Sequence, residues 1–290
     1  MTFPVVLPDG NTYQVAGYLY WTGQLDGKVL HVAVHGAGYN HKYWDADDIG
    51  EHRYSYARHM ASRGFAVLAL DNLGAGASSK PDGDLVTIKE EAVALHQIIQ
   101  GLGAAPVGAS FRKIVLVGHS MGSAQVITAQ STYHDADGMV VTGWVSTRHT
   151  VPLPPDALDA LFGAPYVFLP PQMRAQVFYG GDFDPEMPVY DNKNLIDRVP
   201  RGVFNQDSAT TPRIEASISA GIRSPVLLIF SELDPLMPAS FASSDAAAYS
   251  NAVSVETFVA RHVGHNLNLH RFNLEAWARI DNWIRDKVAG

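Results

Sequence analysis

Residues 113–131 read KIVLVGHSMGSAQVITAQS, an apolar run followed by a glycine- and serine-containing turn and a helix-forming segment. The continuous apolar run is typical of a strand buried on both faces of a parallel sheet. A serine at a sharp strand-to-helix turn has a strained backbone, and small residues two positions away, here Gly118 and Gly122, avoid a clash. The helix N-terminus directs free N–H groups at the same point. Although this pattern also arises by chance, its setting predicts a turn that presents Ser120 as a nucleophile.

Similar apolar runs recur along the chain, each bounded by turn residues. We predict strands over Thr12–Tyr20, Val29–His35, Phe65–Asp71, Lys113–Gly118, Met139–Ser146, Val226–Ser231 and Ser254–Val259. Helical patterns cover Tyr54–Arg63, Thr87–Gly101, Ser120–Ser131, Ser240–Tyr249 and Asn273–Lys287. This alternation predicts an α/β fold: a doubly wound, mostly parallel sheet of about eight strands with helices on both faces. The first predicted strand, Thr12–Tyr20, mixes polar and apolar residues, which favours an antiparallel strand at the edge of the sheet.

The alternation is interrupted once. From about Arg148 to Pro212 no strand-like apolar run occurs, and the segment is rich in Pro, Asp and aromatic residues. A structureless loop of this length is uncommon inside a compact domain. We therefore expect residues 1–147 and 213–290 to form the core, and residues 148–212 to form a small, mostly helical cap over one edge of the sheet.

Composition excludes several classes of protein. The 290 residues are 47% hydrophobic and only 17% charged, which is unlike a disordered chain. The formal net charge of −8 is unlike that of a nucleic-acid binder, so we expect no nucleic-acid partner. Without cysteine, disulfides and thiolate chemistry are excluded. No apolar run is long enough for a membrane span, and the first residues do not resemble a signal peptide, so a cytoplasmic location is expected.

A serine nucleophile needs a base, and the base needs a carboxylate to orient it. Asp234 and His265 both follow predicted strands, and carboxyl ends of parallel strands meet at one edge. Glu232 is an alternative to the aspartate but lies closer to its strand. His262 and His270 are alternatives to the histidine; we favour His265 because Gly264 before it permits a close backbone approach.

The sequence HGAG at residues 35–38 follows another predicted strand. Small residues there allow a backbone N–H to face a cavity, so we expect the amides of Ala37 and Met121 to stabilise an oxyanion. An ordinary glycine-containing turn is the alternative. His35 is expected to hold this loop rather than to react.

No metal or cofactor is expected. The twelve histidines do not show the spacing of a zinc site. Gly74–Ser78 lacks the residues of a phosphate-binding loop and is interpreted as a tight turn. Asp182 and Asp184 are interpreted as a solvated acidic loop rather than a cation site.

The motifs HGAG, DNLGAGASS (residues 71–79), GHSMG, SELDP and VGHN, in this order, resemble those of the α/β-hydrolase superfamily from about Tyr13 to the C-terminus. HGAG and GHSMG are similar to the motifs of monoacylglycerol-lipase-like and carboxylesterase-like members. The sequence GHNLNLH at residues 264–270 differs from theirs. Dehalogenases and epoxide hydrolases of this fold have aspartate at the turn. Ser120 therefore implies acyl chemistry without a cofactor.

We thus expect a serine hydrolase acting on a small to medium, apolar ester or lactone, with Ser120, His265 and Asp234 as its catalytic residues. A C–C hydrolase or cofactor-free perhydrolase of this fold, or a slow-turnover ligand receptor, are the alternatives. The oligomeric state is not indicated by the sequence. His149 is a candidate for substrate contact, and aromatic cap residues either wall the pocket or form the cap's own core: Phe162, Tyr166, Phe168, Phe178, Tyr179, Phe183, Tyr190 and Phe204.

Overall fold

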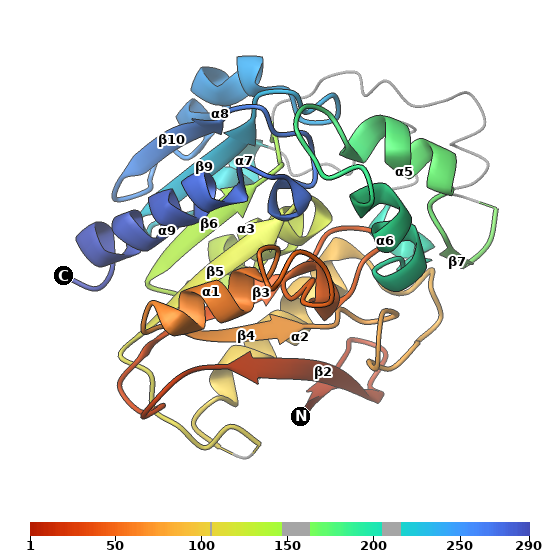
Figure 1. The fold of residues 1–290 in the computed structure, drawn as a ribbon. Coiled ribbons are helices and arrows are strands. Elements are labelled where there is room, and N and C mark those ends of the chain that lie inside the picture. The colour runs from red at the N-terminus through yellow and green to blue at the C-terminus, as the bar shows by residue number, and fades with distance from the viewer. Residues whose placement is uncertain (105, 147–162, 205–215) are drawn as a thin grey trace.

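The computed structural model describes residues 1–104, 106–146, 163–204 and 216–290 (Figure 1). Its main feature is an eight-stranded sheet in the order β1-β2-β4-β3-β5-β6-β9-β10. The strands are β1 (Thr2–Val6), β2 (Thr12–Tyr20), β3 (Val29–Val34), β4 (Ala66–Leu70), β5 (Lys113–His119), β6 (Gly138–Thr142), β9 (Val226–Ser231) and β10 (Val255–Ala260).

Six of the strands, from β4 to β10 in the sheet order, are parallel, and β1 and β2 are antiparallel additions at one side. The predicted doubly wound, mostly parallel sheet is therefore confirmed. After β3 the chain first builds β4 on one side and then returns to build β5 on the other. The strand order thus reverses between β3 and β5, which is where open α/β sheets form their binding crevice.

Helices cover both faces of the sheet, as predicted (Figure 1). On one face, α1 (Tyr56–Ser62) packs against α9 (Asn273–Lys287). On the other face lie four helices, each in contact with the next: α2 (Ile88–Gln100), α3 (Met121–Tyr133), α7 (Ala216–Ser219) and α8 (Ala242–Ala248). Short 3-10 turns lie at His41–Tyr43, Arg201–Val203, Ala239–Phe241 and Leu267–Leu269.

The apolar runs form the core. Every residue of β3, β4, β6 and β9 is buried, which is the pattern expected of strands covered on both faces. Thr87 begins α2 with a capping box to Glu90, and the Ser55 side chain accepts from the Arg58 amide at the start of α1. Capping side chains therefore fix where these two helices begin.

Within the expected cap, residues 163–204 contain two helices, α5 (Pro171–Phe178) and α6 (Met187–Asn194). They also contain a two-stranded antiparallel sheet of β7 (Tyr166–Val167) and β8 (Val199–Pro200). These two short strands were not predicted, because two-residue strands are too short to leave a period-two pattern. The boundaries of the cap at 148 and 212 lie outside the described residues and stay a prediction.

Candidate active site

Ser120 lies at the turn between β5 and α3, with φ 52° and ψ −122°. A non-glycine residue in this region of backbone space is strained and persists only when its surroundings fix it. A side chain at Gly122 would place a Cβ 2.3 Å from the Val34 carbonyl oxygen, and one at Gly118 would be 2.6 Å from the Ser123 Cα. The two glycines are therefore required, as predicted from the sequence.

The structure brings Ser120, His265 and Asp234 together from three separate loops. The Ser120 hydroxyl lies 2.9 Å from His265 Nε2, and His265 Nδ1 lies 2.7 Å from Asp234 Oδ2. The imidazole and the carboxylate are both almost fully buried. Asp234 Oδ1 accepts hydrogen bonds from the backbone amides of Leu236 (2.8 Å) and Met237 (3.0 Å), which fix the carboxylate in the turn after β9.

The alternative residues lie elsewhere. Glu232 accepts a hydrogen bond from the His262 backbone amide at 2.7 Å, and His262 is exposed. His270 is buried; its Nδ1 lies 2.7 Å from the Asn266 carbonyl oxygen, and its Nε2 lies 2.8 Å from the Gly180 carbonyl oxygen and 3.1 Å from the Gly264 amide nitrogen. His270 therefore supports the loop that carries His265. Gly264 itself is needed because a Cβ there would meet Gly180 at 2.3 Å.

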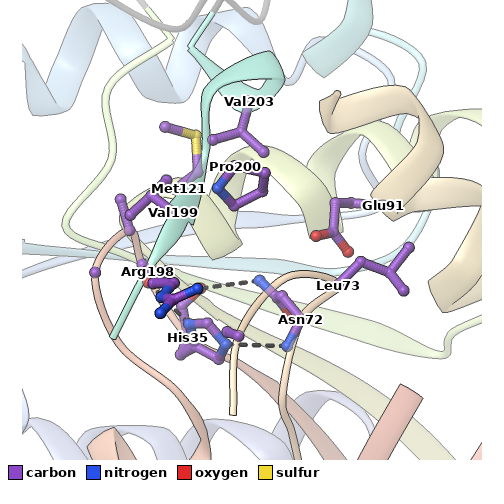
Figure 2. Close-up of a pocket in the computed structure, with 13 residues that line it drawn as sticks. His35, Asn72, Leu73, Glu91, Met121, Arg198, Val199, Pro200 and Val203 are labelled. Carbon is purple, nitrogen blue, oxygen red and sulfur yellow. Dashed lines mark hydrogen bonds between the residues drawn. The ribbon is translucent and has the colours of Figure 1, made fainter. Parts of the chain in front are cut away.

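Ala37 and Met121 are both among the residues that line one small, half-open cavity, and Met121 is labelled in Figure 2. Neither amide donates a hydrogen bond to a residue that the structure describes. Met121 is the first residue of α3, where helix N–H groups have no partner within the helix. The two amides are thus available to an oxygen bound beside Ser120.

His35 holds the loop that carries Ala37. Its Nδ1 donates to the Gly36 carbonyl at 2.8 Å, and its Nε2 accepts from the Asn72 amide at 3.0 Å. Burial lowers the pKa of His35, so the ring stays neutral and keeps this pair of contacts. Because the Gly36 carbonyl and the Ala37 amide belong to one peptide unit, the contact orients that amide.

His119, next to Ser120, is a second buried histidine beside His265, with ring centroids 5.1 Å apart. Its Nδ1 lies 3.0 Å from the Thr142 hydroxyl, and its ring stacks on Tyr43 at 4.5 Å. Burial lowers the pKa of His119 well below its usual value. The neighbouring ring is therefore neutral and does not oppose a positive charge on His265.

The sequence did not indicate a buried polar network between the cap and the site. Arg174, on α5, is fully buried and forms an ion pair with Asp191 on α6. Arg174 also donates to the Gly38 carbonyl (3.2 Å), while Asp191 accepts from the hydroxyls of Tyr39 (2.8 Å) and Tyr179 (2.6 Å). Gly38 and Tyr39 follow Ala37, so the cap contacts the proposed oxyanion loop directly.

The aromatic cap residues have mixed positions. Phe178 is buried, and its ring lies 5.4 Å from that of His265, whereas Phe168 is exposed. The Tyr166 hydroxyl donates to the Pro81 carbonyl of the core at 2.7 Å. Phe162 and His149 lie outside the described residues.

The Gly74–Ser78 turn and the acidic pair Asp182 and Asp184 both make contacts within the protein. In the Gly74–Ser78 turn, the Ala77 amide donates to Asp71 at 2.9 Å. Asp182 and Asp184 both form ion pairs with Arg271. Within the described ranges, no cluster of three potential metal ligands occurs, and no helix is long and apolar enough to span a bilayer.

A model described as the alpha/beta hydrolase family matches residues 32–279. The chain belongs to the alpha/beta hydrolase family. A search of curated protein sequences found no match.

Solved structures with a similar fold include an esterase from Exiguobacterium antarcticum, with a TM-score of 0.68, 17% identity and coverage of 100% of both chains. A thermophilic esterase from Thermogutta terrifontis has a TM-score of 0.67, 18% identity and coverage of 99% of both chains. A meta-cleavage product hydrolase from Pseudomonas fluorescens has a TM-score of 0.63 and 15% identity, covering 98% of this chain and 96% of its own. At identities of 15–18%, the similarity to these structures shows that this chain shares their fold.

Proposed function

We propose that this protein is a serine hydrolase that cleaves a small to medium, mainly apolar carboxylic ester or lactone through an acyl-enzyme on Ser120. The observation that carries the proposal is the continuous contact from the Ser120 hydroxyl to His265 Nε2 (2.9 Å) and from His265 Nδ1 to Asp234 (2.7 Å). Membership of the alpha/beta hydrolase family supports a hydrolase, and two of the similar structures are esterases.

In this mechanism Ser120 Oγ attacks the substrate carbonyl carbon while His265 Nε2 takes the hydroxyl proton. The carbonyl oxygen becomes negative and is stabilised by the Ala37 and Met121 amides, each worth on the order of 3 kcal/mol. The bond to the leaving oxygen then breaks as His265 returns the proton to it. Water repeats the sequence on the acyl-enzyme and releases the acid. Asp234 keeps the Nδ1 proton in place and stabilises the imidazolium.

The test is a comparison of the wild-type protein with Ser120→Ala. The variant is expected to fold, to lose at least a thousandfold in kcat toward p-nitrophenyl butyrate, and to resist labelling by a serine-directed phosphonate. Ser123→Ala is the matched control, because its hydroxyl is buried against the Thr142 carbonyl (2.9 Å). Turnover retained by Ser120→Ala would refute the proposal.

The same assay separates the alternatives. A receptor would release about one equivalent of p-nitrophenol and stop, since it would not regenerate free serine. A C–C hydrolase would turn over a β-diketone faster than the ester, and a perhydrolase would form peracid from acetate and peroxide. Steady ester turnover faster than either reaction is the result expected here.

A further inference from the structure

We propose that Tyr39 is a positioning residue for the reaction. Its buried hydroxyl links Asn266, the residue after His265, to Asp191 on α6 of the cap. Tyr39 itself lies two positions after Ala37, so one hydroxyl connects the loop of the proposed base, the loop of a proposed oxyanion amide and the cap. This inference rests on the proposed function and adds a residue to it that does not touch the substrate.

The Tyr39 hydroxyl makes two hydrogen bonds of opposite sense. It donates to Asp191 Oδ2 at 2.8 Å and accepts from Asn266 Nδ2. Burial raises the pKa of Tyr39 well above its usual value, so the hydroxyl keeps the proton that it donates. Tyr39 is 1% exposed and Asn266 is fully buried, so water does not compete for either bond. The hydroxyl therefore cannot turn or move without breaking one of the two bonds.

Asn266 is fixed on three sides. Its backbone amide donates to the Phe178 carbonyl at the end of α5 (3.2 Å), and its own carbonyl oxygen lies 2.7 Å from His270 Nδ1. Its side chain is held by Tyr39. Because Asn266 and His265 share a peptide bond, a displacement of Asn266 also displaces the catalytic imidazole.

The loop that leads to Tyr39 lies directly against the nucleophile. A Cβ at Gly36 would be 2.9 Å from the Ser120 Cβ, which leaves this loop no room to shift toward the serine. Asp191, which accepts from the Tyr39 hydroxyl, forms the buried ion pair with Arg174, so the acceptor is itself fixed. A misplacement of about 1 Å in a catalytic group can cost on the order of a hundredfold in rate. The bonds of Tyr39 thus connect the parts whose spacing sets the rate.

Tyr179 makes only half of this link and is therefore a matched control. Its hydroxyl is also buried and donates to the same oxygen, Asp191 Oδ2, at 2.6 Å. In the described part of the chain the side chain of Asn266 bonds Tyr39 and not Tyr179. If the two hydroxyls serve only to satisfy the buried carboxylate, removing either has the same effect on activity. If Tyr39 positions the base, only its removal affects the reaction.

The experiment compares Tyr39→Phe with Tyr179→Phe in the turnover of p-nitrophenyl butyrate, with thermal unfolding to show that both fold. Tyr39→Phe is expected to lower kcat and kcat/KM equally, by about tenfold or more, so that KM is unchanged. This is the pattern of a residue that aligns the transition state without binding the substrate. Tyr179→Phe is expected to keep both constants within about twofold of wild type.

Asn266→Ala breaks the other end of the link and gives a second readout. It is expected to lower kcat as Tyr39→Phe does, and the double variant is expected to lose no more than the larger single loss, because both substitutions break one link. A loss of stability alone does not produce this pattern. If Tyr39→Phe does not fold, Asn266→Ala decides, and a kcat within about twofold of wild type would overturn the inference.

Two further results would overturn the inference while the wild-type protein still hydrolyses the ester. One is an equal kcat in Tyr39→Phe and Tyr179→Phe, and the other is a double variant in which the losses of Tyr39→Phe and Asn266→Ala multiply. Failure of the proposed function is a different result, because the wild-type protein itself would then not turn over the ester and Ser120 would not be labelled.

Discussion

Asp234 contacts His265 through Nδ1, and this contact decides which ring nitrogen faces Ser120. In Asp234→Asn the amide can donate to Nδ1 and so favours the tautomer with its proton on Nε2, which cannot accept from serine. We expect kcat for ester hydrolysis to fall on the order of 10⁴-fold with little change in fold, as measured by steady-state kinetics and thermal unfolding.

Glu232→Gln is the matched control for this prediction, because Glu232 contacts the His262 backbone and not His265. Its kcat is expected to stay within about twofold of wild type. If Asp234→Asn kept more than a tenth of the wild-type kcat, the assignment of Asp234 as the orienting carboxylate would be wrong.

Sequence reasoning placed Ser120, His265 and Asp234 in one site because each follows a strand whose end lies at the same edge of the sheet. The structure brings these side chains into contact. The burial of Glu91 was not predicted, because beside Glu90 in a helical pattern it resembles an ordinary solvated glutamate. Glu91 contacts Gln125, 34 positions away in the sequence, and a local pattern does not encode such a contact.

The cap is joined to the loop that carries Ala37 by the buried pair of Arg174 and Asp191. Removing one partner of a buried pair leaves an uncompensated charge, which typically costs about 3–5 kcal/mol. We therefore expect Arg174→Met to lower the free energy of unfolding by about that amount in urea denaturation. Loss of the contact to the Gly38 carbonyl should also lower kcat for ester hydrolysis.

The double variant Arg174→Met, Asp191→Leu removes both charges and is expected to recover part of this stability, so the two substitutions are not additive. Lys113→Met is the control, since Lys113 and Asp137 form a partly exposed pair at 2.8 Å whose loss is expected to cost less than about 1 kcal/mol. Strict additivity of the Arg174 and Asp191 substitutions would contradict the coupling inferred here.

The elements themselves show where sequence patterns are informative. The central strands and α9 were predicted closely, because burial on both faces or a sustained helical face leaves a long pattern. Strand β1 was missed because Pro4 lies within it; the position is tolerated since β1 is an edge strand. Strand β6 ends at Thr142, four residues before the predicted end, and Gly143 follows it with a φ of 57°.

Buried ionisable groups throughout the protein make its stability depend on pH in two opposing ways. Burial lowers the pKa of five histidines below the usual 6.5: His31, His35, His59, His119 and His270. As the pH falls through 6.5, these histidines take up protons in the unfolded chain but stay neutral in the folded chain. Their contribution to the free energy of unfolding is therefore complete above pH 6.5 and is lost as the pH falls. For His31, whose pKa is lowered to about 3, the loss between pH 7 and pH 5 is about 2 kcal/mol.

Glu91 acts in the opposite direction, because its pKa is raised from 4.5 to about 8. Its contribution is complete below pH 4.5 and is lost as the pH rises toward 8, which amounts to about 2–3 kcal/mol between pH 5 and pH 7. From pH 5 to pH 7, the free energy of unfolding of Glu91→Gln is therefore expected to increase relative to that of the wild type. Urea denaturation of both proteins at several pH values measures this difference. Parallel pH profiles for the two proteins would mean that the Glu91 carboxyl is ionised in the folded state.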